Sequence, residues 1–242
     1  MLTPSQIEQY HRDGYVIPDF QMPPEVLESI KTRHAALVQR KPEFRDYCSA
    51  LLDQDQGFFD YCNNAEILDM VAQLIGQDIA LWNSSFFAKP ALNGKRTPWH
   101  QDGEYWPITP LATCTTWLAV DDSTIENGCL RVLRGSHRDQ RLKKHNTVAA
   151  GDVTLTQELD RSEYDESKAV EPYASFDVRH LLQDDTLEAC PRPTLLLATS
   201  RKGQRSGQDV NMACKVLSVE ASVAGRRAPS RLTKRTRSSV RI

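Results

Sequence analysis

A histidine and an aspartate two positions apart are the residues of this sequence best suited to bind a metal ion. His100 and Asp102 lie within residues 98–106, between stretches whose patterns predict strands. On a strand, residues i and i+2 project to the same face, so an imidazole nitrogen and a carboxylate oxygen converge on one point. Such a pair supplies two of the three ligands of a 2-His-1-carboxylate site, which binds ferrous ion and leaves coordination positions open.

The His-x-Asp pattern also has an ordinary interpretation, because it arises by chance in many proteins. In that case the two side chains form a hydrogen bond on the surface and bind nothing. The neighbouring Trp99, Tyr105 and Trp106 favour an enclosed site instead, since aromatic side chains line most small-molecule pockets.

The size and composition of the chain predict one domain with its own core. The chain has 242 residues, of which 26% are charged and 40% hydrophobic. No apolar run approaches the roughly 18 residues that cross a bilayer. The first residues lack the pattern of a secretory signal, and the final Val-Arg-Ile differs from a peroxisomal address. We therefore expect a cytoplasmic protein without a membrane partner.

Charge divides the chain into two unlike parts. Residues 1–200 carry 19 basic and 30 acidic side chains, whereas residues 201–242 carry 11 basic and 2 acidic ones. This asymmetry predicts either a nucleic-acid-binding tail or a segment foreign to the domain before it. The tail contains no Trp, Tyr or Phe to stack on bases, so nucleic acid is the less favoured partner.

Local patterns predict helices in the first third of the chain. Thr3, Pro4 and Gln6 form the pattern of a capped helix start, and Gly14 ends that helix. A second helix is expected from the Pro23-Pro24 pair to about residue 40. Residues 65–75 form a third helix, which Gly76 ends. The second of these has an apolar stripe at helical spacing, made of Leu27, Ile30, His34 and Leu37.

Short strands are predicted after the helices. Apolar and β-branched runs separated by turn residues predict strands over residues 79–82, 85–88, 114–120, 129–133 and 194–198. Polar residues 138–190 are expected to form a long loop or insert. Helices followed by short antiparallel strands indicate an α+β fold that ends in a β-sandwich or barrel.

Several motifs in one order resemble the phytanoyl-CoA dioxygenase family. They are Phe-Ala-Lys-Pro at residues 87–90, Trp-His-Gln-Asp at residues 99–102, and the run from Glu-Asn-Gly to Gly-Ser-His at residues 126–137. The opening, from residues 2–4 to residues 14–16, is similar as well. The resemblance covers about residues 1–137. It implies N-terminal helices packed on a double-stranded β-helix, or jelly roll, that binds Fe(II) and 2-oxoglutarate.

The resemblance also implies roles for individual residues at the metal. His100 and Asp102 match the family's first two iron ligands, while His137 matches a framework position that packs near the site without binding metal. The implied reaction uses Fe(II), 2-oxoglutarate and O2 to hydroxylate a small or lipid-like molecule.

Three further residues are candidates for contact with the co-substrate. Trp117 and Ser85 match family positions beside the 2-oxoglutarate pocket, and Lys89 is suited to neutralise a carboxylate of this molecule. Each has an alternative in its own sequence context. These alternatives are a core tryptophan, a structural strand serine and a solvated surface lysine.

The C-terminal part departs from the family pattern. The family has a second histidine ligand near the end of the jelly roll, followed about ten residues later by an arginine that pairs with 2-oxoglutarate. The last histidine here is His180, which would replace that ligand only if its loop folds inward. Residues 187–189 resemble the lead-in to the missing ligand, but residues 190–193 continue as Cys-Pro-Arg-Pro. Arg201 or Arg205 would imitate the arginine, although each lies in a basic tail.

We therefore expect an oxygenase domain over residues 1–190 and a basic, irregular segment over residues 191–242, with the jelly roll incomplete at its C-terminal end. A shifted reading frame explains this segment best, and a genuine extension is the alternative. The other frames of the coding DNA decide between them. Weak activity follows from the missing ligand, a non-catalytic member of the same fold is the second hypothesis, and a nucleic-acid binder is the third.

Overall fold

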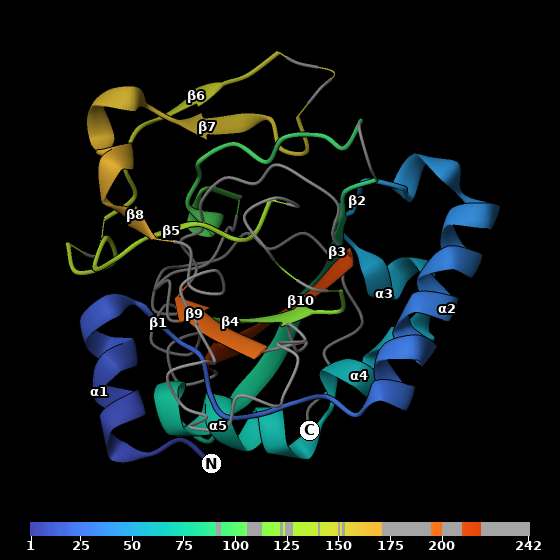
Figure 1. The fold of residues 1–242 in the computed structure, drawn as a ribbon. Helices are drawn as coiled ribbons and strands as arrows, with labels where there is room; N and C mark the ends of the chain where they lie inside the picture. Colours follow the sequence, from blue (N-terminus) through green and yellow to red (C-terminus); the bar gives the residue numbers. More distant parts are fainter. Residues whose placement is uncertain are drawn as a thin grey trace, which may run out of the picture.

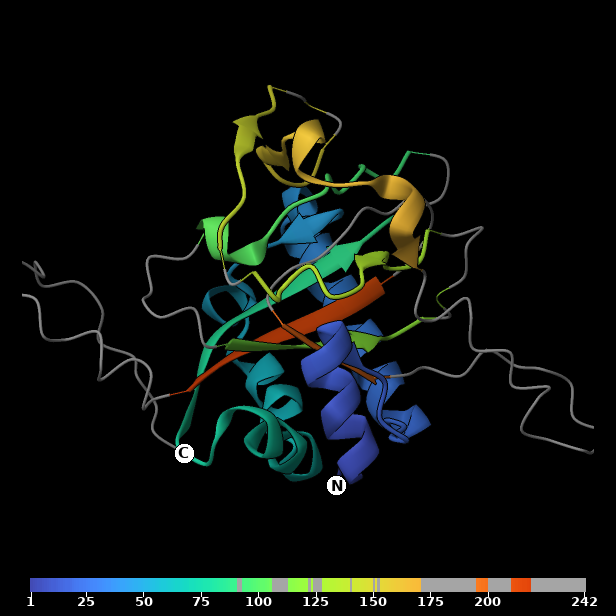
Figure 2. The same ribbon diagram turned by 90° about the vertical axis from the view of Figure 1, so that its left-hand side faces the viewer.

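The computed structural model describes most of the first 170 residues and the backbone of two later strands. The described residues are 1–90, 93–105, 113–121, 123, 128–139, 141–149, 151, 153–170, 195–199 and 210–218. Helices cover one face of a central sheet, and small strands and turns lie over the opposite face (Figures 1 and 2). The predicted α+β class is confirmed. No helix in the described part combines the length and apolar character that a bilayer crossing requires.

All three predicted helices are present, with two short ones between them. The helices are α1 (Pro4–Asp13), α2 (Pro24–Arg40), α3 (Leu51–Gln54), α4 (Phe59–Cys62) and α5 (Ala65–Ile75). The capping box is confirmed, because the Thr3 side chain accepts from the Gln6 amide while the Gln6 side chain accepts from the Thr3 amide. The buried face of α2 consists of the predicted stripe, Leu27, Ile30, His34 and Leu37.

The central sheet is antiparallel throughout and has the order β1-β9-β4-β10-β3-β2. Its strands are β1 (Tyr15–Val16), β2 (Tyr47–Cys48), β3 (Ile79–Ala88), β4 (Thr113–Ala119), β9 (Leu195–Thr199) and β10 (Val210–Ser218). Two small sheets pair β5 (Val132–Leu133) with β8 (Ala169–Val170) and β6 (His145–Thr147) with β7 (Gln157–Leu159). Short 3-10 helices complete the description: η1 (Pro42–Phe44), η2 (Gln56–Phe58), η3 (Asp102–Tyr105), η4 (Arg161–Glu163) and η5 (Glu166–Lys168).

Two regions differ from the expectation of loops and irregular chain. The expected loop at residues 138–190 contains β6, β7 and β8, since these segments pair with one another and with β5. Within residues 191–242, β9 occupies nearly the predicted strand and β10 lies between β3 and β4. Apolar residues at every second position from 210 to 216 are the sequence signal for β10. The domain boundary and the origin of this segment remain predictions.

The two faces of the sheet bury separate apolar clusters. Because side chains alternate along β4, Cys114 and Leu118 pack toward the helices, whereas Trp117 and Ala119 pack on the opposite side. The cluster on the helical side is the larger one and includes residues of every α-helix. The smaller cluster consists of Tyr15, Trp117, Ala119, Leu130 and Val132. This second face is the one that carries the candidate site.

The turn after β5 caps the C-terminal end of α1. The last carbonyls of a helix have no partner within it and need outside donors. Here Gly135 N–H donates to Asp13 O at 2.8 Å, His137 Nε2 to His11 O at 2.9 Å, and Arg138 Nε to Arg12 O at 2.9 Å. His137 therefore has a framework contact, in line with the role that the resemblance implies.

Gly14 lies between the end of α1 and the turn after β5, where a larger residue does not fit. It has a φ of +86°, and a Cβ built there would lie 2.5 Å from His137 Nδ1. We expect Gly14→Ala to lower the free energy of unfolding by about 2 kcal/mol, from the positive φ and the collision together. In a His137→Ala background the loss should fall to about 1 kcal/mol, because only the backbone cost remains. Urea unfolding of the four proteins measures both values, and equal losses in both backgrounds would contradict the collision.

Candidate metal and co-substrate site

His100 and Asp102 converge inside the protein, although they do not lie on a strand. His100 precedes η3 and Asp102 begins it, so the side chains converge where the chain enters a 3-10 helix and not through the alternation of a strand. His100 Nε2 lies 3.1 Å from Asp102 Oδ1. The two residues are only 3% and 4% exposed, which excludes the surface version of this hydrogen bond.

The hydrogen bonds of His100 leave two acceptor atoms facing each other. His100 Nδ1 lies 2.8 Å from the Pro98 carbonyl oxygen, so Nδ1 carries the hydrogen and donates it. In the neutral ring, Nε2 then presents a lone pair to the Asp102 carboxylate. Two acceptors at this distance repel each other unless a positive charge lies between them. Either a proton or a metal cation satisfies that requirement.

The separation of these two atoms fits neighbouring ligands of one metal ion. Two donors at about 2.1 Å from a metal and at right angles to each other are about 3 Å apart. The carbonyl on Nδ1 fixes the tautomer that metal binding needs. Thr115 Oγ1 donates a long hydrogen bond of 3.4 Å to Asp102 Oδ2, and the other carboxylate oxygen, Oδ1, faces His100. Among the described residues, no group of three His, Cys, Asp or Glu side chains is placed to hold a metal.

A cavity of about 390 Å3 opens beside the pair. Both His100 and Asp102 line it, and four aromatic side chains contribute to its wall. Burial raises the pKa of the Tyr47 and Tyr105 hydroxyls above their usual value, so both remain neutral at physiological pH. The described wall contains no lysine or arginine and consists of Tyr47, Ser49, Ala50, Trp82, Asn83, Phe87, His100, Asp102, Tyr105 and Leu155.

Of the residues predicted to hold 2-oxoglutarate, Ser85 lies on β3, Trp117 on β4, and Lys89 directly after the end of β3. Ser85 lies on the same face of β3 as Asn83 and Phe87, which line the cavity. It is fully buried, and its Oγ has no hydrogen-bond partner among the described residues. Lys89 is 2% exposed, so the solvated alternative for this residue is wrong. Trp117 is 0% exposed and packs in the smaller cluster.

Several predicted features lie outside the described residues. These are Trp106, most of the Glu-Asn-Gly turn at residues 126–128, the residues at 180 and 187–193, and the two arginines at 201 and 205.

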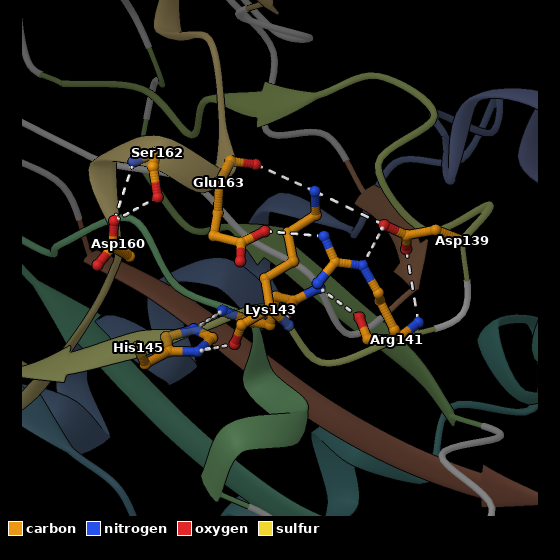
Figure 3. A network of polar contacts seen from close by, with 8 residues as sticks. Asp139, Arg141, Lys143, His145, Asp160, Ser162 and Glu163 are labelled. Carbon is orange, nitrogen blue, oxygen red and sulfur yellow. Dashed lines mark hydrogen bonds and ion pairs between the residues drawn. The ribbon is translucent and has the colours of Figure 1, made fainter.

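Sequence reasoning missed a histidine that contacts the site from β6. His145 Nε2 accepts the backbone N–H of Gln101, the residue between His100 and Asp102, at 3.0 Å. Figure 3 shows this histidine beside the charged residues of the same segment. The hairpin β6–β7 is joined by further ion pairs, and the Lys144 ammonium holds the pKa of Asp160 well below its usual value. No local pattern in the sequence predicts a contact across 44 residues.

Comparison with known proteins identifies the family. The phytanoyl-CoA dioxygenase family model matches residues 10–174. The chain belongs to the phytanoyl-CoA dioxygenase family. This family consists of Fe(II)- and 2-oxoglutarate-dependent dioxygenases, so the family predicted from the sequence is confirmed.

Individual relatives of this phytanoyl-CoA dioxygenase family member match over part of their length. A probable phytanoyl-CoA dioxygenase of Caenorhabditis elegans is 28% identical over 167 residues, covering 57% of this chain and 54% of the relative. The peroxisomal phytanoyl-CoA dioxygenase of Homo sapiens is 38% identical over 98 residues, covering 38% and 28%. The matches therefore span about half or less of these relatives.

Solved structures share the fold. The crystal structure of EctD from S. alaskensis with 2-oxoglutarate and 5-hydroxyectoine superposes with a TM-score of 0.64, at 16% identity. The superposition covers 91% of this chain and 77% of that chain. At this identity the likeness establishes the fold of the family member and leaves its substrate open.

Proposed function

We propose that this chain is an Fe(II)- and 2-oxoglutarate-dependent dioxygenase that hydroxylates a small or lipid-like molecule. The observation that carries the proposal is the pair of atoms His100 Nε2 and Asp102 Oδ1, buried 3.1 Å apart at the wall of an aromatic cavity. These two side chains would hold the ferrous ion. With 2-oxoglutarate and O2, bound iron supplies the oxidation of an unactivated C–H bond, giving succinate, carbon dioxide and the alcohol.

The protein's own residues would bind and orient the two organic molecules. Ser85 Oγ offers an unused hydrogen-bonding group behind the cavity, and the buried Lys89 brings a cation toward the carboxylates of 2-oxoglutarate. Trp117 would close the pocket on the inner side. The aromatic wall favours an apolar substrate group and excludes water from the reacting atoms. In this proposal the central sheet and the two small sheets form the jelly roll.

We further propose that turnover is slow, because two protein ligands hold iron less tightly than three. The described residues supply no third His, Cys, Asp or Glu ligand, and this observation favours the second candidate, a non-catalytic member of the same fold. Binding of nucleic acid by residues 201–242 is a third candidate that no contact in the described residues supports.

Anaerobic loading followed by turnover tests the proposal. We expect one ferrous ion to bind at saturation, to be lost on desalting, and to allow slow release of succinate from 2-oxoglutarate. Metal binding without any succinate would favour the non-catalytic candidate. No binding of Fe(II) at all would overturn the proposal, and tight iron with rapid turnover would contradict the expected impairment.

A further inference from the structure

The segment between the two metal-binding side chains is held from outside by the hairpin β6–β7. Gln101 is 3% exposed, and its side chain points away from the pair toward residues 141–143. Its Nε2 donates to the Arg141 carbonyl at 3.2 Å, and its Oε1 accepts from the Lys143 amide at 2.6 Å. Two residues before Gln101, the Trp99 carbonyl accepts from the Leu159 amide of β7 at 2.7 Å.

His145 completes this arrangement with both of its ring nitrogens. Its side chain is 0% exposed. Nδ1 donates to the Lys143 carbonyl at 2.8 Å, so Nε2 is the acceptor for the Gln101 N–H at 3.0 Å. These two contacts fix the orientation of the ring and the role of each nitrogen. Because its only lone pair already accepts the Gln101 N–H, this histidine does not replace the missing iron ligand.

The backbone amide that His145 holds belongs to the peptide between His100 and Gln101. A peptide unit is planar, so fixing its N–H fixes the orientation of the whole plane. Two backbone rotations on either side of that plane then decide where the side chains of His100 and Asp102 point. A neighbour that orients a metal ligand in this way typically changes metal affinity by about 10- to 100-fold.

Charged residues fix the strand that carries His145. Arg141 pairs with Glu163 at 2.8 Å, and Lys143 Nζ donates to the Glu163 carbonyl at 3.0 Å (Figure 3). Arg141 and Lys143 also lie 3.5 and 3.6 Å from Asp139. These contacts connect the segment before β6 to Glu163 without involving His100 or Asp102. The hairpin can therefore act as a support for the metal pair.

We propose that His145 is a positioning residue for the metal site, acting through the Gln101 amide. This inference rests on the proposed function, because it assumes that His100 and Asp102 bind a divalent metal ion. His145 touches neither metal nor substrate. It sets the angle at which the two ligands meet, and so links the hairpin β6–β7 to metal affinity.

Three substitutions separate this role from a general effect on stability. In His145→Gln the side-chain oxygen reaches toward the position of Nε2 and can still accept the Gln101 N–H. In His145→Asn the side chain keeps a donor for the Lys143 carbonyl but is too short to reach Gln101. His145→Phe keeps the ring volume without either hydrogen bond. Lys144→Ala is the matched control, because it removes an exposed ion pair with Asp160 from the same hairpin.

Two measurements on these proteins test the proposal. The first is hydrogen exchange of the Gln101 amide in metal-free protein, which we expect to be protected in the wild type, H145Q and K144A, and fast in H145N and H145F. The second is Co(II) titration followed by the visible absorption of the bound ion. We expect affinity to fall about tenfold or more, with a changed spectrum, in H145N and H145F, and to stay within about threefold in H145Q.

The possible failures are distinguishable. A wild-type protein that binds no Co(II) would overturn the proposed function and this inference with it. If the wild type binds and H145N binds equally well with the same spectrum, only the positioning role is overturned. Slow exchange of the Gln101 amide in H145N would contradict the hydrogen bond itself. Since H145F also leaves a buried carbonyl unbonded, H145N decides the outcome if H145F does not fold.

Discussion

Replacing His100 with alanine is expected to weaken binding of Fe(II) or Co(II) by at least about 100-fold, because one of only two identified protein ligands is removed. Asp102→Asn should have a similar effect, since the amide keeps the shape of the carboxylate but lacks its negative charge. Both residues are buried at the cavity wall. Among the described residues, no further group of His, Cys, Asp or Glu side chains is placed to bind the ion instead. Anaerobic titration of the metal-free proteins measures the affinities.

The matched control for these substitutions is His11→Ala, which removes an exposed histidine on α1 and keeps the backbone carbonyl that His137 contacts. Its metal affinity should equal that of the wild type. A His100→Ala protein that binds metal as tightly as this control would show that the ion binds elsewhere.

Replacing Trp117 with alanine is expected to lower the free energy of unfolding by about 3–5 kcal/mol, as large-to-small changes at buried aromatic positions do. Trp117 is 0% exposed and belongs to the smaller apolar cluster with Tyr15 and Leu130. Guanidinium unfolding followed by circular dichroism gives the value.

Trp117→Phe separates the packing role from a role beside 2-oxoglutarate. The smaller ring should recover most of the lost stability, because it still fills much of the same space. We expect the KM for 2-oxoglutarate to rise in this variant, since the indole is proposed to close the co-substrate pocket. An unchanged KM would leave Trp117 as a core residue only, and a loss below about 1 kcal/mol in Trp117→Ala would contradict its place in the core.

Local sequence signals were sufficient for the three long helices, α1, α2 and α5, but not for the short helices α3 and α4. The capping residues of α1, the stripe of α2 and the glycine after α5 each act within a few positions, so the sequence contains all the information that places them. The same holds for β4, whose β-branched and apolar run is continuous. The predicted pair His100 and Asp102 came from their spacing, their aromatic neighbours and the resemblance to the family, and the structure brings the two side chains together.

Tertiary contacts explain what the sequence did not predict. His100 and Asp102 meet through the 3-10 turn η3, whereas strand alternation was the expected cause. Lys89 is buried just after β3, although a lysine side chain is by itself typical of a protein surface. The contact between Gln101 and His145 depends on the docking of a hairpin from a region expected to be a loop.

The most direct test of the central claim is the position of a ferrous ion in crystals grown or soaked without oxygen. Anomalous scattering at the iron edge locates the ion independently of any assumption about the ligands. We expect one strong peak about 2.1 Å from both His100 Nε2 and Asp102 Oδ1. Iron bound at other side chains, or none in the cavity at a concentration that saturates binding in solution, would contradict the assignment of these two residues.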